Sequence, residues 1–129
     1  MMTATLYRVQ AKLLSAAVST GTTGAWPCFV GYVPDLPDQM IGLQFTGGFP
    51  QDTHEGENLL ETFQLFVRGG EQAHSTVYDK WKAAFDALEN SDITDLRLIR
   101  AMASAPLSFS DARNRQCMTA NFNVVRANA

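Results

Sequence analysis

The chain contains 129 residues, of which 46% are hydrophobic and 18% are charged, and these values fit one folded domain spanning residues 1–129. The net charge of −3 and the pI near 5.2 argue against nonspecific binding to nucleic acid, which depends on basic residues that neutralise phosphates. No run of about 18 apolar residues is present, so we expect no membrane span, and the first residues lack the basic and apolar segments of a secretory signal.

The first predicted element is a helix from Thr5 to Val18. Its apolar residues recur at spacings of three and four: Leu6, Val9, Leu13 and Ala17. This spacing predicts one buried stripe along the helix. The next segment, residues 19–24, contains two glycines, which favour the left-handed turn that ends many helices.

Two segments with the character of strands follow, at residues 28–33 and 40–46. The first is rich in residues that favour strands, and the second alternates between apolar and other side chains. Between them lie Pro34 and Pro37, whose rings prevent a continuing ladder of hydrogen bonds. We therefore predict a hairpin with a stiff connection.

The longest polar interval runs from Gly47 to Asn58, and we predict a loop there. Residues 59–68 then alternate between apolar and polar side chains, with Phe66 as the exception. This pattern predicts a central strand that ends at Gly69-Gly70.

Residues 71–90 give the clearest helical pattern. Large side chains step by four, three, four and three residues: His74, Tyr78, Trp81, Phe85 and Leu88. The spacing predicts a buried aromatic stripe, in which His74 is a packed histidine.

Two further strands complete the chain. Residues 94–105 predict a strand with a bulge near Leu98-Ile99, because apolar residues change face there. After a polar turn at residues 110–115, the last strand places its apolar residues on one face: Met118, Ala120, Phe122 and Val124.

The order of these elements predicts an α+β fold. Alternation on one side of several strands favours a single, mainly antiparallel sheet of about five strands, with two helices packed on one face. The helix between the third and fourth strands allows one parallel pair, which would make the sheet mixed.

No combination of residues predicts catalysis, a cofactor or a metal site. The Cys and His residues form no close pair of the kind that binds zinc: Cys28, His54, His74 and Cys117. No nucleophile motif and no phosphate-binding loop is present. We interpret the two cysteines as buried reduced thiols, and the acidic residues around His54 as solvated.

Arginines occur in two pairs, Arg97 with Arg100 and Arg113 with Arg115. The first pair lies on a predicted strand and the second on a predicted turn. Because arginines on protein surfaces are commonly solvated or paired with acids, we favour that interpretation over a nucleic-acid site.

Three segments carry a resemblance to a known family. They are Val33-Pro34-Asp35-Leu36-Pro37-Asp38 with Ile41-Gly42-Leu43, then Thr46-Gly47-Gly48-Phe49-Pro50, and then Phe63-Gln64-Leu65-Phe66-Val67-Arg68-Gly69 running into a helix. With the N-terminal helix and a last strand that contains Asn121-Phe122-Asn123-Val124, they resemble the tail terminator, or minor capsid, proteins of long-tailed phages. The resemblance covers nearly the whole chain. It departs from the family at Glu61-Thr62, where a proline or an apolar residue is expected, and at the paired Gly69-Gly70.

This resemblance implies a structural protein of the virion without enzymatic activity or cofactor. It implies a homohexameric ring that caps the finished tail tube, stops its polymerisation and joins it to the head–tail connector. The implied partners are further copies of the chain, the major tail tube protein and the connector or stopper protein. DNA would pass through the ring without sequence-specific binding. The protein would be made in the host cytoplasm and would reside at the junction of tail and head.

A ring closes through two different surfaces on each subunit, so protruding loops are the natural candidates for contacts. The first candidate loop contributes Gly47, Gly48, Phe49, Pro50, Asp52, His54 and Glu57. The second contributes Asp111, Arg113 and Arg115.

Three other hypotheses remain open. The first is another neck protein, such as a head-completion or head–tail connector protein. The second is a module that binds a small molecule in an aromatic pocket formed by Trp26, Tyr32, Tyr78 and Trp81. A hydrolase that uses Asp52, His54 and Glu57 ranks last.

Overall fold

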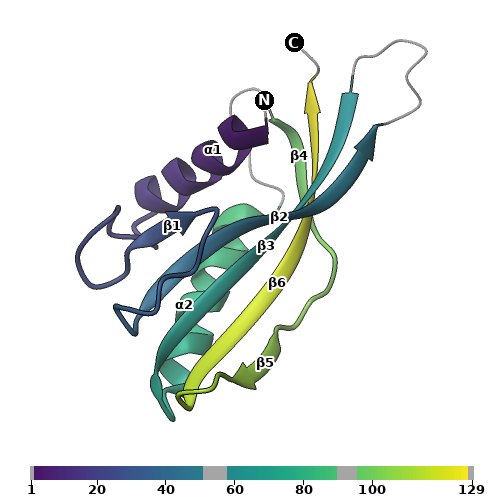
Figure 1. The fold of residues 1–129 in the computed structure, drawn as a ribbon. Helices are drawn as coiled ribbons and strands as arrows, with labels where there is room; N and C mark the ends of the chain where they lie inside the picture. Colours follow the sequence, from purple (N-terminus) through teal and green to yellow (C-terminus); the bar gives the residue numbers. More distant parts are fainter. Residues whose placement is uncertain (1, 51–57, 90–95, 128–129) are drawn as a thin grey trace.

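The computed structural model describes residues 2–50, 58–89 and 96–127, which form one mixed sheet with two helices on one of its faces (Figure 1). The helices are α1 (Met2–Ser15) and α2 (His74–Leu88). The strands are β1 (Cys28–Val30), β2 (Met40–Pro50), β3 (Asn58–Glu71), β4 (Leu96–Ala101), β5 (Leu107–Ser110) and β6 (Arg115–Ala127). The predicted α+β class, with both helices on one face, is confirmed.

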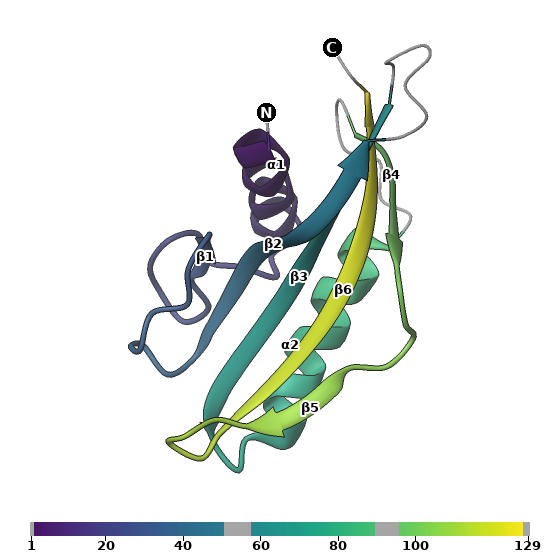
Figure 2. The same cartoon turned by 45° about the vertical axis from the view of Figure 1, so that its right-hand side comes forward.

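The described strands are ordered β1-β2-β3-β6-β4, and β5 also pairs with β6 (Figure 2). β3 is central, as predicted. β5 is an additional strand that the sequence analysis missed. It pairs with residues 116–119 of β6, whereas β4 pairs with residues 122–126, so the two short strands follow one another along the same side of β6.

The predicted hairpin of residues 28–33 and 40–46 is wrong, because β1 and β2 run parallel. The connecting residues 31–39 carry the chain back along the outer face of the sheet, the face away from the helices. There the Val33 Cγ2 atom lies 3.4 Å from the position that a Cβ atom on Gly42 would occupy. The connection is therefore packed onto the sheet. The parallel pair also differs from the one that we considered, since β3 and β4 each pair with β6 in the antiparallel sense.

The buried stripe of α1 is confirmed at Leu6, Val9 and Leu13, but Ala17 is exposed. Ala17 lies beyond the end of the helix and has a φ of 61°. An alanine, and not one of the predicted glycines, therefore takes the left-handed conformation that ends this helix.

The stripe of α2 is rotated relative to the prediction. Its buried residues are Val77, Trp81, Ala84 and Leu88. His74 and Tyr78 are exposed, so the interpretation of His74 as a packed residue is wrong. The large aromatic Tyr78 lies at the margin of the stripe, where it stacks on Trp81 with 5.9 Å between ring centroids. The small Ala84 takes a central place because it allows the helix to approach the sheet closely.

The inward alternation of β6 is confirmed, because its four predicted residues are buried against the helices: Met118, Ala120, Phe122 and Val124. In β4 the register shifts between Leu96 and Leu98. This shift confirms a bulge near the predicted place.

The predicted end of the central strand at Gly69-Gly70 is wrong, since β3 continues to Glu71. The reason for glycine at position 69 is the nearness of α2. A Cβ atom added to Gly69 would lie 2.5 Å from Val77 Cγ2, whereas one added to Gly70 would meet nothing within 4 Å.

We expect Gly69→Ala to destabilise the fold by about 1–3 kcal/mol, because the helix must move away from the sheet. Gly70→Ala is the matched control and is expected to change the free energy of unfolding by less than about 1 kcal/mol. Urea denaturation followed by the fluorescence of the two tryptophans, Trp26 and Trp81, measures both. Equal effects at the two positions would contradict the close approach of α2.

Candidate assembly surface

Two arginines are almost fully buried where β3 ends and β6 begins. Arg68 and Arg115 expose only 3% and 5% of their surfaces. Charged side chains are rarely buried to this degree unless they are paired. The partners of these two arginines therefore define a polar network with many hydrogen bonds.

Arg68 holds the backbone of the loop that contains the two prolines. Its Nε donates a hydrogen bond to Asp38 O at 2.9 Å, and its Nη2 donates to Pro34 O at 2.8 Å and to Pro37 O at 2.7 Å. Nη2 also donates a fourth, longer hydrogen bond to Asp35 O at 3.3 Å. We call residues 33–38 the clamped loop, because its main chain wraps around this guanidinium group.

Arg115 binds two side chains of the same loop, because it donates to Asp38 Oδ1 at 3.1 Å and to Asp35 Oδ1 at 3.2 Å. It also donates to Asp111 Oδ2, outside the loop, at 2.9 Å. The half-exposed Arg113 adds an ion pair with Asp35 Oδ2 at 2.7 Å. Positive and negative side chains are thus matched around the loop, and the interpretation of Arg113 and Arg115 as ion-paired is confirmed.

Asp111 holds the turn that delivers these arginines. Its Oδ1 accepts the backbone amides of Arg113 at 2.9 Å and of Arg115 at 3.0 Å. Burial raises the pKa of Asp111, but these hydrogen bonds and the charge of Arg115 outweigh burial and lower the pKa below its ordinary value. The carboxylate therefore stays charged at neutral pH and keeps the turn in place.

The predicted assembly residues fall into three groups. Asp111, Arg113 and Arg115 lie together, but Arg115 is buried at the start of β6 and is not part of an exposed loop. The second group lies in β2, paired with β3, so the predicted loop is wrong there: Gly47, Gly48, Phe49 and Pro50. Asp52, His54 and Glu57 lie outside the described residues.

The glycine at position 47 has a local explanation. The register between β2 and β3 shifts between Phe45 and Gly47, and Gly47 has a φ of +124°. A β-bulge with a glycine in this conformation lets the strand continue where sequence patterns indicate a loop. Pro50 is tolerated because β1 pairs only with the earlier part of β2, so no second partner requires its amide.

The sequence analysis missed Asp35, Asp38 and Arg68 as members of the cluster, and Leu36 at its tip. Leu36 is 65% exposed although the backbone on both sides of it is held by Arg68. The available signal was the repeated proline-aspartate pair, which brings two carboxylates within one short turn. Because its loop is held in place before any partner binds, Leu36 is a candidate for a contact.

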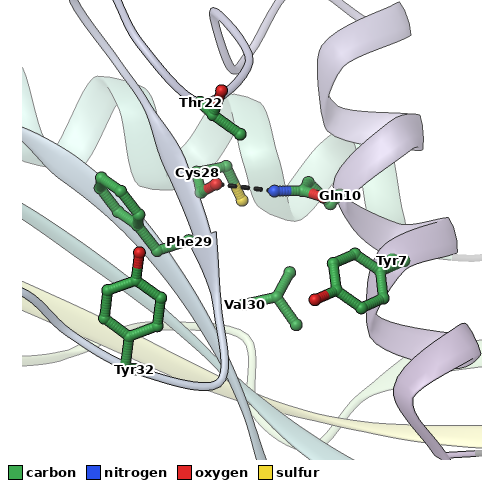
Figure 3. A pocket seen from close by; sticks show the side chains of 7 residues that line it. All are labelled: Tyr7, Gln10, Thr22, Cys28, Phe29, Val30 and Tyr32. Carbon is green, nitrogen blue, oxygen red and sulfur yellow. Dashed lines mark hydrogen bonds between the residues drawn. The ribbon is translucent and has the colours of Figure 1, made fainter.

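A shallow groove lies between α1 and β1 (Figure 3). It has a volume of about 290 Å³ and is lined by Tyr7, Gln10, Thr22, Cys28, Phe29, Val30 and Tyr32. Gln10 Nε2 donates to Cys28 O at 2.7 Å, which ties the helix to the edge strand. The rings of Phe29 and Tyr32 lie 5.4 Å apart. The groove is therefore aromatic and carries no charged side chain.

The two cysteines are free and buried, which confirms the prediction of reduced thiols. Burial raises the pKa of Cys28 to about 12. Its thiol is therefore protonated at neutral pH, and Cys28 lacks the thiolate that a nucleophile or a metal ligand requires.

An apolar strip lies at the opposite edge of the sheet, beside β6. It consists of Met102, Leu107 and Phe109, all exposed. Leu107 and Phe109 belong to β5, and the Phe109 ring contacts Phe66 of the outer face at 6.4 Å between centroids. This strip was also missed, although the alternation of residues 107–110 is typical of a strand.

The four aromatic residues considered for a small-molecule pocket do not line one common pocket. Trp81 is in the core, and Tyr78 stacks on it. Trp26 lies under Lys80, whose Nζ is 5.2 Å from the ring centroid. Only Tyr32 of the four lines the groove.

No three His, Cys, Asp or Glu side chains within residues 2–50, 58–89 and 96–127 are arranged to hold a metal ion. Arg100 is ion-paired with Glu89 at 3.4 Å, as predicted for this arginine. Neither described helix has the length and apolar character needed to cross a membrane.

Comparison with known proteins gives one family and a set of similar folds. Residues 9–128 match the family described as bacteriophage tail terminator protein. No curated protein sequence matches the chain. Among solved structures, the chain is similar to a protein of the "Virion of native gene transfer agent (GTA) particle", with 17% identity and a TM-score of 0.67. That similarity covers 93% of this chain and 92% of the other, and at this identity it establishes the fold alone.

Proposed function

Because this chain belongs to the bacteriophage tail terminator family, we propose that it forms a ring that caps the finished tail tube and stops its growth. The family match across residues 9–128 is the observation that carries this proposal. The fold it shares with a protein of a gene transfer agent virion is consistent with a place in a particle.

In this proposal the ring is homohexameric and lies in the virion at the junction of tail and head. The major tail tube protein binds one side, and the head–tail connector or stopper protein binds the other. DNA passes through the opening without sequence-specific binding. The acidic net charge supports weak contact with DNA. So does the uncharged row of Gln44, Gln64 and Asn121, which are neighbours on the outer face of the sheet.

The clamped loop supports a docking role because it is ordered before any partner binds. A loop that is already fixed loses little conformational entropy on association, so more of its contact energy appears as affinity. We assign contact with the tail tube protein to Leu36 at the tip. Asp111, Arg113 and Arg115 then contribute by positioning this loop.

The test is to polymerise purified tail tube protein with and without this chain. We expect tubes that end in a ring-shaped density and stop growing when the chain is added, whereas tubes alone elongate without limit. Electron microscopy measures tube length, and mass photometry measures the ring. Binding to the connector protein without any effect on tubes would contradict the proposal and would favour the other neck-protein hypothesis.

A pair of variants locates the contact. Leu36→Asp is expected to weaken the capping of tubes at least tenfold, since a charge would be buried against the tube protein. Tyr78→Asp is the matched control, because Tyr78 is 39% exposed on α2, which covers one face of the sheet, whereas the clamped loop packs on the other face. Both variants should fold, which circular dichroism verifies. Equal capping by the two would remove Leu36 from the contact.

A further inference from the structure

The sheet presents two exposed apolar surfaces, the groove beside β1 and the strip beside β6. Figures 1 and 2 show β1 and β5 at opposite edges of the sheet in both views. Among the described strands, β1 pairs only with β2, and β5 pairs only with β6. The outer backbone groups of Cys28 in β1 are bonded to Gly21 O and Gln10 Nε2, so a further contact at this edge would be made by side chains.

The strip is unusual for an edge that remains in water. Soluble proteins protect open sheet edges with charged side chains, which prevent pairing with other chains. Residues 101–110 contain no charged side chain, and Leu107 is 68% exposed. Such a surface is expected to be covered in the functional assembly.

The three apolar residues of the strip form a continuous line. Phe109 pairs with Cys117 of β6 and Leu107 pairs with Thr119. The Met102 amide donates to Asn121 O at 2.9 Å. The line therefore follows successive outward positions of β6, and Leu107 is its most exposed member.

The groove has the complementary properties. It is concave, carries no charged side chain and is rimmed by Tyr7 and Tyr32, which are both about half exposed. Figure 3 shows the Tyr7 ring on α1 turned toward Val30 on the edge strand. A groove of this size lies at the lower limit for small-molecule sites, and it suits one or two apolar side chains of a protein partner.

We propose that the strip of one subunit, centred on Leu107, docks into the groove between α1 and β1 of the next copy in the ring. A head-to-tail ring needs two different surfaces on each subunit that fit one another. These two lie at opposite edges of one sheet, and the exposed apolar side chains of the strip suit a groove that is lined by uncharged side chains. A contact with the tube protein alone would require only one of these two surfaces. The inference rests on the proposed ring and names the contact between its subunits.

The test is cross-linking of the ring on capped tail tubes. In the double variant Tyr7→Cys with Leu107→Cys, a short bis-maleimide is expected to give a ladder of covalent multimers on a denaturing gel. Each single variant should give no ladder. The native cysteines are buried, and the unmodified chain gives the background. Tyr78→Cys with Leu107→Cys is the matched control and is expected to give no ladder, because Tyr78 is an exposed tyrosine on α2 outside both surfaces.

A second variant tests the same contact without cross-linking. Leu107→Asp is expected to weaken the association of subunits at least tenfold, while Tyr78→Asp, at an exposed position of α2 outside both surfaces, leaves it unchanged. If Leu107→Asp forms a normal ring and the double variant Tyr7→Cys with Leu107→Cys gives no ladder, the inference is overturned and the proposed function still stands. Covalent dimers from Leu107→Cys alone would overturn it by showing that two strips meet. Failure to form any ring on tubes would overturn both.

Discussion

Replacement of Arg68 by alanine is expected to destabilise the fold by about 2–5 kcal/mol, because several hydrogen bonds from one buried charged donor are lost together. The variant leaves the carbonyl groups of Pro34, Pro37 and Asp38 without their donor. A carbonyl that stays buried without a donor costs about 1–3 kcal/mol, and the loop recovers part of this by turning toward water, since Pro37 and Asp38 are themselves exposed. The pKa of Arg68 is lowered first by burial and then by the positive charge of Arg115. Removing Arg68 therefore also removes a repulsion between the two arginines, but this gain is smaller than the loss of the hydrogen bonds, because Arg115 is itself paired with acids.

Urea denaturation measures this effect, and limited proteolysis measures the release of the clamped loop. Arg113→Ala is the matched control. Its side chain is 54% exposed and makes one ion pair with a carboxylate that is itself exposed, so we expect a loss below about 1 kcal/mol. Arg68→Lys should recover only part of the stability, because an ammonium group cannot reproduce the planar fork that reaches several carbonyls. Equal losses in Arg68→Ala and Arg113→Ala would show that the loop is not held by the buried arginine.

The same variants separate stability from docking. If the clamped loop acts by being ordered in advance, Arg68→Lys should weaken the capping of tail tubes even where the chain remains folded. In this variant the Leu36 side chain is the same, and only the mobility of its loop increases. A folded Arg68→Lys variant that caps as well as the unmodified chain would indicate that the rigidity of the loop has no part in binding.

Local patterns in the sequence were sufficient for most elements. Alternation in β3 and β6, and the spacing of apolar residues in α1, follow directly from which face of each element is buried. The same patterns carry no information about chain direction. Residues 28–30 and 40–46 read equally well as a hairpin or as a parallel pair, and the parallel direction is seen only in the structure.

The candidate site was predictable only in part. Asp111, Arg113 and Arg115 were singled out, but their roles depend on Asp35 and Asp38, which lie more than 70 residues away in the chain. No periodicity records such a contact. The exposure of Leu36 likewise depends on Arg68 holding the loop from beneath. Residues that act through distant partners are therefore the ones that reasoning from local patterns misses.

The second large effect is expected at the centre of the core. Phe122 is fully buried on the helix face of β6. Its ring stacks on Phe63 of β3 with 5.3 Å between centroids, and the Phe85 ring of α2 lies 5.9 Å away. Phe122 therefore joins two central strands and a helix. Phe122→Ala should cost about 3–5 kcal/mol, which is a large share of the roughly 5–15 kcal/mol that stabilises a typical domain.

Asn121→Ala is the control, because Asn121 is the next residue of the same strand and is exposed on the outer face. A change within about 0.5 kcal/mol is expected there, since surface positions of this kind contribute little. Thermal unfolding followed by circular dichroism compares the two. The contrast between neighbours tests whether this part of β6 holds the fold together through its helix face alone. Similar losses at both positions would mean that the outer face around Asn121 is also a packed surface, and that it is not available to partners.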